Sequence, residues 1–329
     1  MKIAIVGVGA IGGYVGHRLA HAGEDVTFIA RGKNLEALQT RGIRLMLADG
    51  TEETVPRLRA TADYAAAGPQ DLVILAMKAH QVEAVATDVP KLFGPQTMVV
   101  PMQNGIPYWY FHGIAGALAG TRVKSADPQG LIGQHIPGER VIGCVVYPAA
   151  ELVQPGVIRH IEGDRFPVGE LDGAESERVR QVSECFIRGG LQSPILKDIR
   201  AEIWLKLWGN MTFNPISALT RGTLAGICQY PPSRALVTSM MTEAQSIAGK
   251  LGVTFRVPIE KRIAGAERVG HHKTSMLQDL EAGRALEIDA LLGSVVELAR
   301  LTETPTPHLD TVYALTKLLA KTLEDQRPV

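Results

Sequence analysis

Three polar side chains stand at steps of four in an otherwise apolar segment, IWLKLWGNMTFNP at residues 203–215. They are Lys206, Asn210 and Asn214, and on a helix this spacing places them on roughly one face. A buried ammonium is costly unless it has partners or a chemical task. A lysine here can stabilise the charge that develops on a carbonyl oxygen as hydride reaches carbon, and it can deliver the proton. These residues alone leave open a structural role, with the lysine paired to a carboxylate and the asparagines capping helices.

A second polar group occurs in HHKTSMLQDLEAGRALEIDALLG, residues 271–293. Ser275, Asp279 and Glu287 lie on a segment that leads into a predicted amphipathic helix. Glu287 stands between two apolar residues at the expected start of that helix, so it is a candidate partner for Lys206 or for a substrate hydroxyl. An acidic residue is also favoured at a helix N-terminus without any chemical role.

Histidine and cysteine spacing gives little sign of a metal site. His271 and His272 are adjacent, but the sequence places no carboxylate at ligand spacing beside them, so we predict no zinc. The three cysteines, Cys144, Cys185 and Cys228, are far apart and form neither a disulfide framework nor a CxxC pair. This usage favours a reduced cytoplasmic setting.

The N-terminal run KIAIVGVGAIGG contains a GxGxxG pattern made by Gly7, Gly9 and Gly12, with Ala10 and Ile11 between them. Alone this pattern is weak, but here it follows a predicted strand and opens a predicted helix. The first glycine permits the tight turn, the second lets the backbone approach a pyrophosphate, and the third allows close helix–strand packing. The helix N-terminus supplies N–H groups for the phosphates. The pattern predicts a dinucleotide site.

The end of the second predicted strand, DVTFIARGKN, distinguishes the two nicotinamide cofactors. An NAD site has an acidic residue there to accept hydrogen bonds from the ribose 2′-hydroxyl. This chain has Arg31 and Lys33 instead, while Glu24 and Asp25 stand at the wrong end of the strand. Two cations fit a 2′-phosphate, so the sequence favours NADPH, although a solvated loop arginine is the alternative.

Two further strand ends carry polar residues, Lys78 in MKAHQ and Asn104 in MQNGIP. Ligands of open parallel sheets bind at the carboxyl ends of strands. Lys78 can therefore meet cofactor or substrate, or simply start a helix in solvent. Asn104 with the following glycine can likewise be an ordinary turn.

The elements that must position these residues change in character along the chain. Short branched-apolar runs alternate with helical pattern in the first part, which indicates a parallel sheet with crossover helices. These runs are KIAIVG, DVTFIA, DLVILAM, TMVVPM and VIGCVVY, and PGVIRH with FPVGEL is expected to form a terminal pair of strands. Beyond about residue 198 helical periodicity dominates, with prolines near the helix starts. We predict an α/β protein: a Rossmann-type dinucleotide-binding domain at 1–197 and an all-helical substrate and catalytic domain at 198–329.

Composition excludes several classes of protein. Basic and acidic residues balance at 34 each, so no net field favours nucleic acid or an anionic membrane. Glycines interrupt the apolar N-terminal run, and the sequence has no apolar run of 18 residues. We expect a soluble protein without a membrane span, acting on a small molecule.

The motifs together resemble the ketopantoate reductase family. GVGAIGG, LAMKAHQ, QNG, KLWGNMTFNPISAL and KTSMLQDLEAGRALEID occur here in the order seen in that family, over nearly the whole chain. The last two are much more specific than the glycine pattern. The resemblance implies a Rossmann domain with an all-helical domain, NADPH, and reduction of 2-dehydropantoate to (R)-pantoate in pantothenate and coenzyme A biosynthesis. It also makes a homodimer plausible.

The resemblance implies a role for each matching residue. Lys206 corresponds to the catalytic acid and Glu287 to the catalytic-site carboxylate. The residues matched to substrate binding are Asn210, Asn214, Ser275, which would hold the substrate carboxylate, and Asn104, which would also lie near the nicotinamide. Those matched to cofactor binding are Lys78, Arg31, which would contact the 2′-phosphate, and the Gly7–Gly12 loop with Ala10 and Ile11.

One segment departs from the family pattern. After Asn104 the chain carries a long connection that begins with Tyr108, Trp109 and Tyr110. These aromatic residues are interpreted either as a surface loop packing on itself or as a change of the pocket for a larger 2-oxo acid. The sequence is therefore compatible with three functions. The chain is a ketopantoate reductase, a relative that reduces a different 2-oxo acid or related carbonyl, or an NADPH-binding sensor without turnover.

Overall fold

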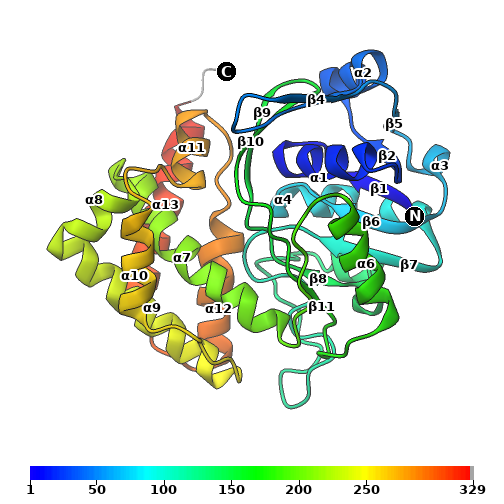
Figure 1. Ribbon diagram of the computed structural model, residues 1–329. Coiled ribbons are helices and arrows are strands. Elements are labelled where there is room, and N and C mark those ends of the chain that lie inside the picture. Colours follow the sequence, from blue (N-terminus) through cyan, green and yellow to red (C-terminus); the bar gives the residue numbers. More distant parts are fainter. Residues whose placement is uncertain (327–329) are drawn as a thin grey trace. The chain divides into compact units, whose positions relative to one another are not determined.

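A computed structural model describes residues 1–326, and its contacts divide them into two compact units (Figure 1). Unit 1 comprises residues 1–103, 111–122 and 129–199, and unit 2 comprises residues 104–110, 123–128 and the chain from Arg200 onward. The sequence predicted one division near residue 197. It did not indicate that two short internal segments, one of them carrying Asn104, group with the helical unit.

Unit 1 contains a five-stranded sheet in the order β5-β2-β1-β6-β7, in which all neighbours are parallel. The strands are β1 (Lys2–Val6), β2 (Asp25–Ile29), β5 (Arg59–Thr61), β6 (Gln70–Leu75) and β7 (Phe93–Pro101). The apolar runs of β1, β2, β6 and β7 are buried, as is typical of parallel sheets. The predicted parallel sheet is confirmed for the runs KIAIVG, DVTFIA, DLVILAM and TMVVPM, and its order is that of a mononucleotide-binding half of the Rossmann fold with two further strands. The run VIGCVVY is not part of it, because its only strand is the two-residue β8 (Gly143–Cys144), which pairs antiparallel elsewhere, and β5 takes an edge of the sheet instead.

The second sheet of unit 1 was only partly predicted. It has four strands in the order β4-β3-β10-β9, namely β3 (Ile43–Met46), β4 (Glu52–Val55), β9 (Ala149–Gln154) and β10 (Val157–Glu162). The expected pairing of PGVIRH with FPVGEL is wrong, because β10 pairs with β9 and β3, while β11 (Val168–Gly169) pairs with β8 (Gly143–Cys144). A tight turn at Gly156 (φ 76°) returns the chain from β9 directly into β10. The strand adjacent in sequence, β9, therefore becomes the antiparallel partner of β10.

Helix α1 (Ala10–His21) contacts strands of both sheets, and two glycines show how closely. A Cβ at Gly13 would lie 2.4 Å from the Ile158 side chain of β10, and one at Gly16 would lie 2.4 Å from Phe28 of β2. The helix that begins at the glycine pattern is therefore fixed on two sides.

Among the remaining helices of unit 1, α2 and α6 have 10 and 12 residues, and the others are no longer than about one turn. These remaining helices are α2 (Gly32–Arg41), α3 (Tyr64–Ala67), α4 (Ala79–Val82), α5 (Leu131–His135) and α6 (Glu177–Arg188), with 3₁₀ turns η1 (Glu83–Val85), η2 (Val89–Leu92) and η3 (Gly138–Arg140). The helical stretch between β6 and β7 is therefore broken into α4, η1 and η2. Pro90 lies within the second 3₁₀ turn and cannot donate a backbone hydrogen bond to continue an α-helix.

All the regular secondary structure in the described residues of unit 2 is helical. Its helices are α7 (Ile199–Thr220), α8 (Leu224–Gln229), α9 (Pro231–Lys250), α10 (Ile259–Arg268), α11 (Ser275–Glu281), the π-helical turn η4 (Asp289–Gly293), α12 (Ser294–Leu301) and α13 (Pro307–Asp325). Prolines stand at or beside the starts of α9, α10 and α13, as predicted. Glu297 of α12 accepts hydrogen bonds from the backbone N–H groups of Lys124 and Ser125 and from the Ser125 hydroxyl, each at 2.7 Å, which ties an internal segment to this unit.

Within residues 1–326, none of the helices is both long enough and apolar enough to span a membrane. All three cysteines are buried and free. Burial raises the pKa of Cys185 to about 12 and raises that of Cys228, so these thiols stay protonated at neutral pH.

Candidate active site

The glycine pattern of unit 1 adopts the geometry that a dinucleotide loop requires. Gly7 has φ 93°, a left-handed conformation that disfavours other residues. A Cβ at Gly12 would lie 2.0 Å from the Gly7 carbonyl oxygen, so only glycine allows α1 to pass this close. At Gly9, by contrast, a Cβ would meet no described atom within 4 Å. The loop thus has one open position, where a pyrophosphate can approach the backbone.

The first turn of α1 offers hydrogen-bond donors beside this open position. Gly9 is the N-cap residue and has no side chain to satisfy the amides that follow it. Ala10, Ile11 and Gly12 are the first helical residues, whose N–H groups have no partner inside the helix. The residues present therefore fit a bound diphosphate.

Arg31 stands at the carboxyl end of β2, where it is the exposed N-cap residue of α2. Lys33, in the first turn of that helix, is also exposed. Asn34 follows, and its amide donates to the Val8 carbonyl at 2.6 Å, which joins the start of α2 to the glycine loop. The two cations thus occupy the strand end where a ribose substituent is recognised.

Lys78 lies at the carboxyl end of β6 as the half-buried N-cap residue of α4. Its backbone N–H donates to the Gln81 side chain at 3.2 Å. Gln103, at the end of the neighbouring β7, donates to the carbonyls of Leu75 and Met77 at 2.8 and 3.0 Å. Sequence reasoning missed Gln103. It lies directly before Asn104 in QNG, and an amide side chain at a strand end was the available signal.

The lysine of unit 2 is placed against the asparagine that the sequence singled out. Lys206 is half-buried on α7, and its Nζ donates to Asn104 Oδ1 at 2.6 Å. The two residues are 102 positions apart in sequence. A neutral amide oxygen is therefore one hydrogen-bond partner of the ammonium.

Asn104 is in turn fixed by the turn that follows it. Gly105 has φ 95°, and a Cβ there would lie 1.9 Å from the Ala290 carbonyl oxygen. Ala290 belongs to η4, and π-helical turns occur frequently at functional sites. Glu287 lies just before this turn, half-buried, and its carbonyl accepts from the Leu291 N–H at 3.3 Å. The predicted helix thus begins after Glu287 and is π-helical in its first turn.

Farther along α7, Asn214 is buried and its amide donates to the Ser275 hydroxyl at 3.3 Å. Ser275 is exposed as the first residue of α11, behind the N-cap Thr274. Half-buried Asn210 lies one turn from each end of this polar face. Lys206 and Asn214 are eight positions apart on the helix, which is about 12 Å along its axis. The face can therefore contact two ends of a small, elongated substrate.

Comparison with known proteins follows this geometry. The family model described as ketopantoate reductase PanE/ApbA matches residues 3–173, and the model of its C-terminal part matches residues 198–320. This chain belongs to the ketopantoate reductase family. Membership makes it an oxidoreductase that uses a dinucleotide cofactor.

Individual members of the family are similar to it over almost their whole length. A 2-dehydropantoate 2-reductase of Mesorhizobium japonicum is 54% identical over 321 residues, which cover 97% of this chain and 98% of that protein. A crystal structure assigned to a ketopantoate reductase of Ralstonia solanacearum is 45% identical, with a TM-score of 0.93 and 98% of each chain covered. A D-mandelate dehydrogenase structure with NADH and anilino(oxo)acetate is 22% identical with a TM-score of 0.83, covering 98% of this chain and all of that one, and this likeness shows the fold.

The aromatic stretch that departs from the family pattern is not a surface loop. Trp109 and Tyr110 are 4% and 2% exposed, so that expectation is wrong. The Tyr110 hydroxyl accepts from Trp204 Nε1 at 2.7 Å, and its carbonyl accepts from Arg200 Nε at 2.8 Å. Burial and the charge of Asp127 raise the pKa of Tyr108, which is therefore neutral at pH 7. The stretch supports the first turns of α7, the helix that carries Lys206.

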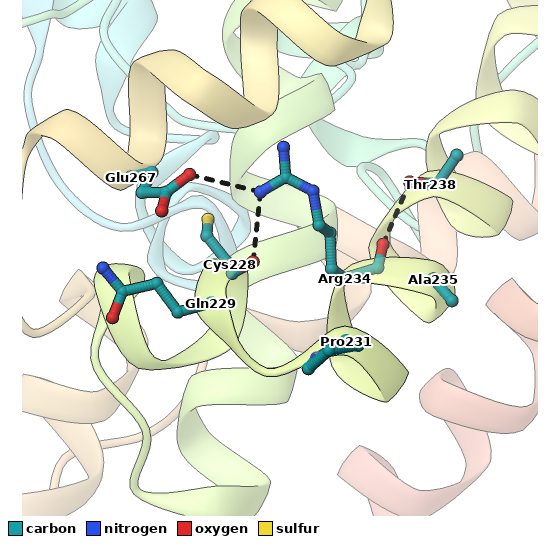
Figure 2. Close-up of a pocket in the computed structure, with 7 residues that line it drawn as sticks. All are labelled: Cys228, Gln229, Pro231, Arg234, Ala235, Thr238 and Glu267. Carbon is teal, nitrogen blue, oxygen red and sulfur yellow. Dashed lines mark hydrogen bonds and ion pairs between the residues drawn. The ribbon is translucent and has the colours of Figure 1, made fainter.

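A cavity of about 470 Å³ lies away from all of these residues. It is bordered by α8, α9 and α10 (Figure 2) and lined by Cys228, Gln229, Pro231, Arg234, Ala235, Thr238 and Glu267. Arg234 donates to Glu267 at 3.2 Å and to the Cys228 carbonyl at 3.1 Å, so its guanidinium is already bound within the protein. The polar face of α7 is the better candidate for chemistry.

Proposed function

We propose that this chain reduces 2-dehydropantoate to (R)-pantoate with NADPH, and that Lys206 is the proton donor. The observation that carries the proposal is the 2.6 Å contact between Lys206 Nζ and Asn104 Oδ1. It brings the Lys206 ammonium and the Asn104 amide, two groups that the sequence assigned to the site from distant segments, to one place in unit 2. The 54% identity to a 2-dehydropantoate 2-reductase supports the choice of substrate.

The cofactor would be held by unit 1. Gly7, Gly9 and Gly12 with the amides of Ala10 and Ile11 would bind the pyrophosphate, as the open space at Gly9 allows. Arg31, aided by Lys33, would bind the 2′-phosphate, and Lys78 would contact the cofactor at the end of β6. When bound, the reduced nicotinamide supplies the hydride that is added to the keto carbon.

The substrate would be held by unit 2. Ser275, oriented by Asn214, donates to the substrate carboxylate, and Asn210 and Asn104 contact its remaining oxygens. As the keto oxygen gains negative charge, Lys206 stabilises it and transfers a proton to it, which completes the hydroxyl group. Glu287 accepts a hydrogen bond from a substrate hydroxyl. The neutral amine of Lys206 then regains its proton from solvent.

The aromatic stretch gives no support to a larger 2-oxo acid as the substrate. Trp109 and Tyr110 are buried as packing for α7. A sensor without turnover is also disfavoured, since binding alone requires no proton donor. A cytoplasmic homodimer stays a prediction.

The test is NADPH oxidation by the purified protein with 2-dehydropantoate, followed at 340 nm (roughly the nicotinamide absorbance maximum) and run beside NADH. Saturable oxidation of NADPH, much faster than that of NADH, is expected. Binding of NADPH without turnover would overturn the substrate and leave the cofactor assignment, and a preference for NADH would overturn the role of Arg31.

A further inference from the structure

Two histidines and a carboxylate gather in unit 1, on the half of α1 that lies beyond the glycine loop. One ring nitrogen each from His17 and His21 and one carboxylate oxygen of Glu53 lie within 4.8 Å of one another. The histidines are four residues apart and therefore share a face of the helix, with their rings stacked at 5.6 Å. Glu53 comes from β4 of the second sheet, 32 residues after His21 in the printed sequence.

His17 is unusual because it is buried without a hydrogen bond. Its exposed fraction is 0%, and among the described residues neither Nδ1 nor Nε2 has a hydrogen-bond partner. A buried polar group in this state costs roughly 1–3 kcal/mol relative to a satisfied one. A neutral imidazole with an unused lone pair is the form that binds metals.

Glu53 is directed toward this face of α1 by the alternation of its strand. In β4, Glu53 and Val55 are half-buried while Glu52 and Thr54 are exposed. The Glu53 carboxylate lies 4.0 Å from His17 Nδ1. Its other contact is Arg18 at 3.4 Å, a long ion pair, and Arg18 also donates to the Gly189 carbonyl at 2.9 Å. The carboxylate can therefore exchange the arginine for a metal while Arg18 keeps a partner.

We propose that His17, His21 and Glu53 form a binding site for a zinc-like divalent transition metal. Two imidazoles and one carboxylate are a donor set that Zn²⁺ uses, with water as the fourth ligand. A tetrahedral centre with bonds of about 2.1 Å places its ligand atoms about 3.4 Å apart. The observed separations exceed this by less than about 1.5 Å. Exposed His21 and half-buried Glu53 supply the adjustment, and His17 stays fixed in the core.

A metal here would join α1 to the second sheet. Helix α1 already contacts β3, β4, β9 and β10. Figure 1 shows β4, β9 and β10 near it. The centre would lie two turns from the amides that face the dinucleotide, because His17 follows Ala10 by seven residues. It would therefore stabilise the helix that presents those amides and would take no part in the hydride transfer.

The test measures binding of ZnCl₂ and CoCl₂ to the untagged chain after treatment with EDTA, by titration calorimetry and by the visible absorption of Co²⁺. One equivalent of metal per chain is expected, with a rise in the thermal midpoint on binding. His21→Ala and Glu53→Gln should each weaken binding at least about tenfold, because each removes a ligand. His308→Ala is the matched control, since His308 contacts Glu243 at 2.6 Å without a second imidazole, and it should bind as the unaltered chain does.

Equal binding by the His21→Ala variant and the unaltered chain would overturn the site, as would the absence of binding to the unaltered chain. His21 is exposed, so this variant is expected to fold even if Glu53→Gln does not. Circular dichroism of each variant checks that folding before the titration.

Discussion

The two units present their candidate binding groups in different ways. In unit 1 the candidate groups are backbone amides: Gly7, Gly9 and Gly12 lack side chains, and three N–H groups of the first helical turn would supply the donors. In unit 2 the candidate groups are side chains of α7, which Asn104 and Ser275 contact from other segments. Backbone recognition is local and therefore readable as a short motif. Side-chain recognition depends on tertiary packing, so it leaves no comparable local motif in the sequence.

The largest expected effect separates catalysis in unit 2 from binding in unit 1. Lys206→Ala should lower kcat by about 10²- to 10⁴-fold, the usual contribution of a general acid, while the Kd for NADPH is unchanged. Steady-state rates and fluorescence titration of NADPH measure the two quantities. Lys261→Ala, which removes an exposed lysine of α10, is the control. A kcat within twofold of the unaltered enzyme would exclude Lys206 as the proton donor.

A smaller effect is expected at the cofactor end. Arg31→Ala removes a charge-assisted contact worth about 1.5–3 kcal/mol, so the KM for NADPH should rise by roughly tenfold to a hundredfold. The weaker activity with NADH should not change, because NADH has no 2′-phosphate. Initial rates with both cofactors measure this. If both KM values rise together, Arg31 supports the fold of the loop instead of recognising the phosphate.

The glycines of the loop allow stability to be separated from binding. Gly12→Ala places a Cβ against the Gly7 carbonyl and should cost about 1–3 kcal/mol of unfolding free energy, as overpacking does. Gly9→Ala meets open space at an ordinary φ of −82°, so its stability should change by less than about 0.5 kcal/mol while the Kd for NADPH rises. Thermal melts and NADPH titrations compare the pair. Equal melting midpoints for both variants would contradict the close helix packing at Gly12.

The smallest effect concerns the internal segment at residues 123–128. Ser125→Ala removes one of three hydrogen bonds to Glu297 and should cost about 0.5–1.5 kcal/mol without changing kcat. Thr242→Ala, which removes a hydroxyl that bonds only within α9, is a control for the loss of a hydroxyl group. A loss of kcat in Ser125→Ala would show that this segment also shapes the polar face of α7.

The sequence predicted the parts of the fold that depend on local pattern. The parallel strands, the glycine loop and the helices that begin at prolines all follow from periodicity and from backbone restrictions of single residues. The family resemblance assigned both Lys206 and Asn104 to the site, but it did not predict the hydrogen bond between them, which spans 102 positions and has no local signature. The roles given to the site residues stay predictions.

Other features were missed because their cause is tertiary. The surface-loop interpretation of Trp109 and Tyr110 is wrong, because both side chains are buried and Tyr110 is hydrogen-bonded to Trp204 and Arg200 within unit 2. The first turn of the helix after Glu287 is π-helical where Gly105 packs on Ala290, a contact between distant segments. The His17, His21 and Glu53 cluster escaped notice because the strand that carries Glu53 was not predicted.

The grouping of residues 104–110 and 123–128 with the C-terminal helices has a consequence for how the chain reaches its native state. The hydrogen bond of Asn104 cannot form until Lys206 has been synthesised. That of Ser125 requires Glu297, which lies 172 positions later. Such contacts close large loops and form slowly, because the chain in the loop loses conformational entropy before the contact can stabilise it. On the ribosome, the glycine loop and the first strands emerge early, while the helical unit cannot close until α12 has been synthesised. A fragment beginning at Arg200 would lack both internal segments, so the chain cannot be divided there into two parts that each carry a complete unit.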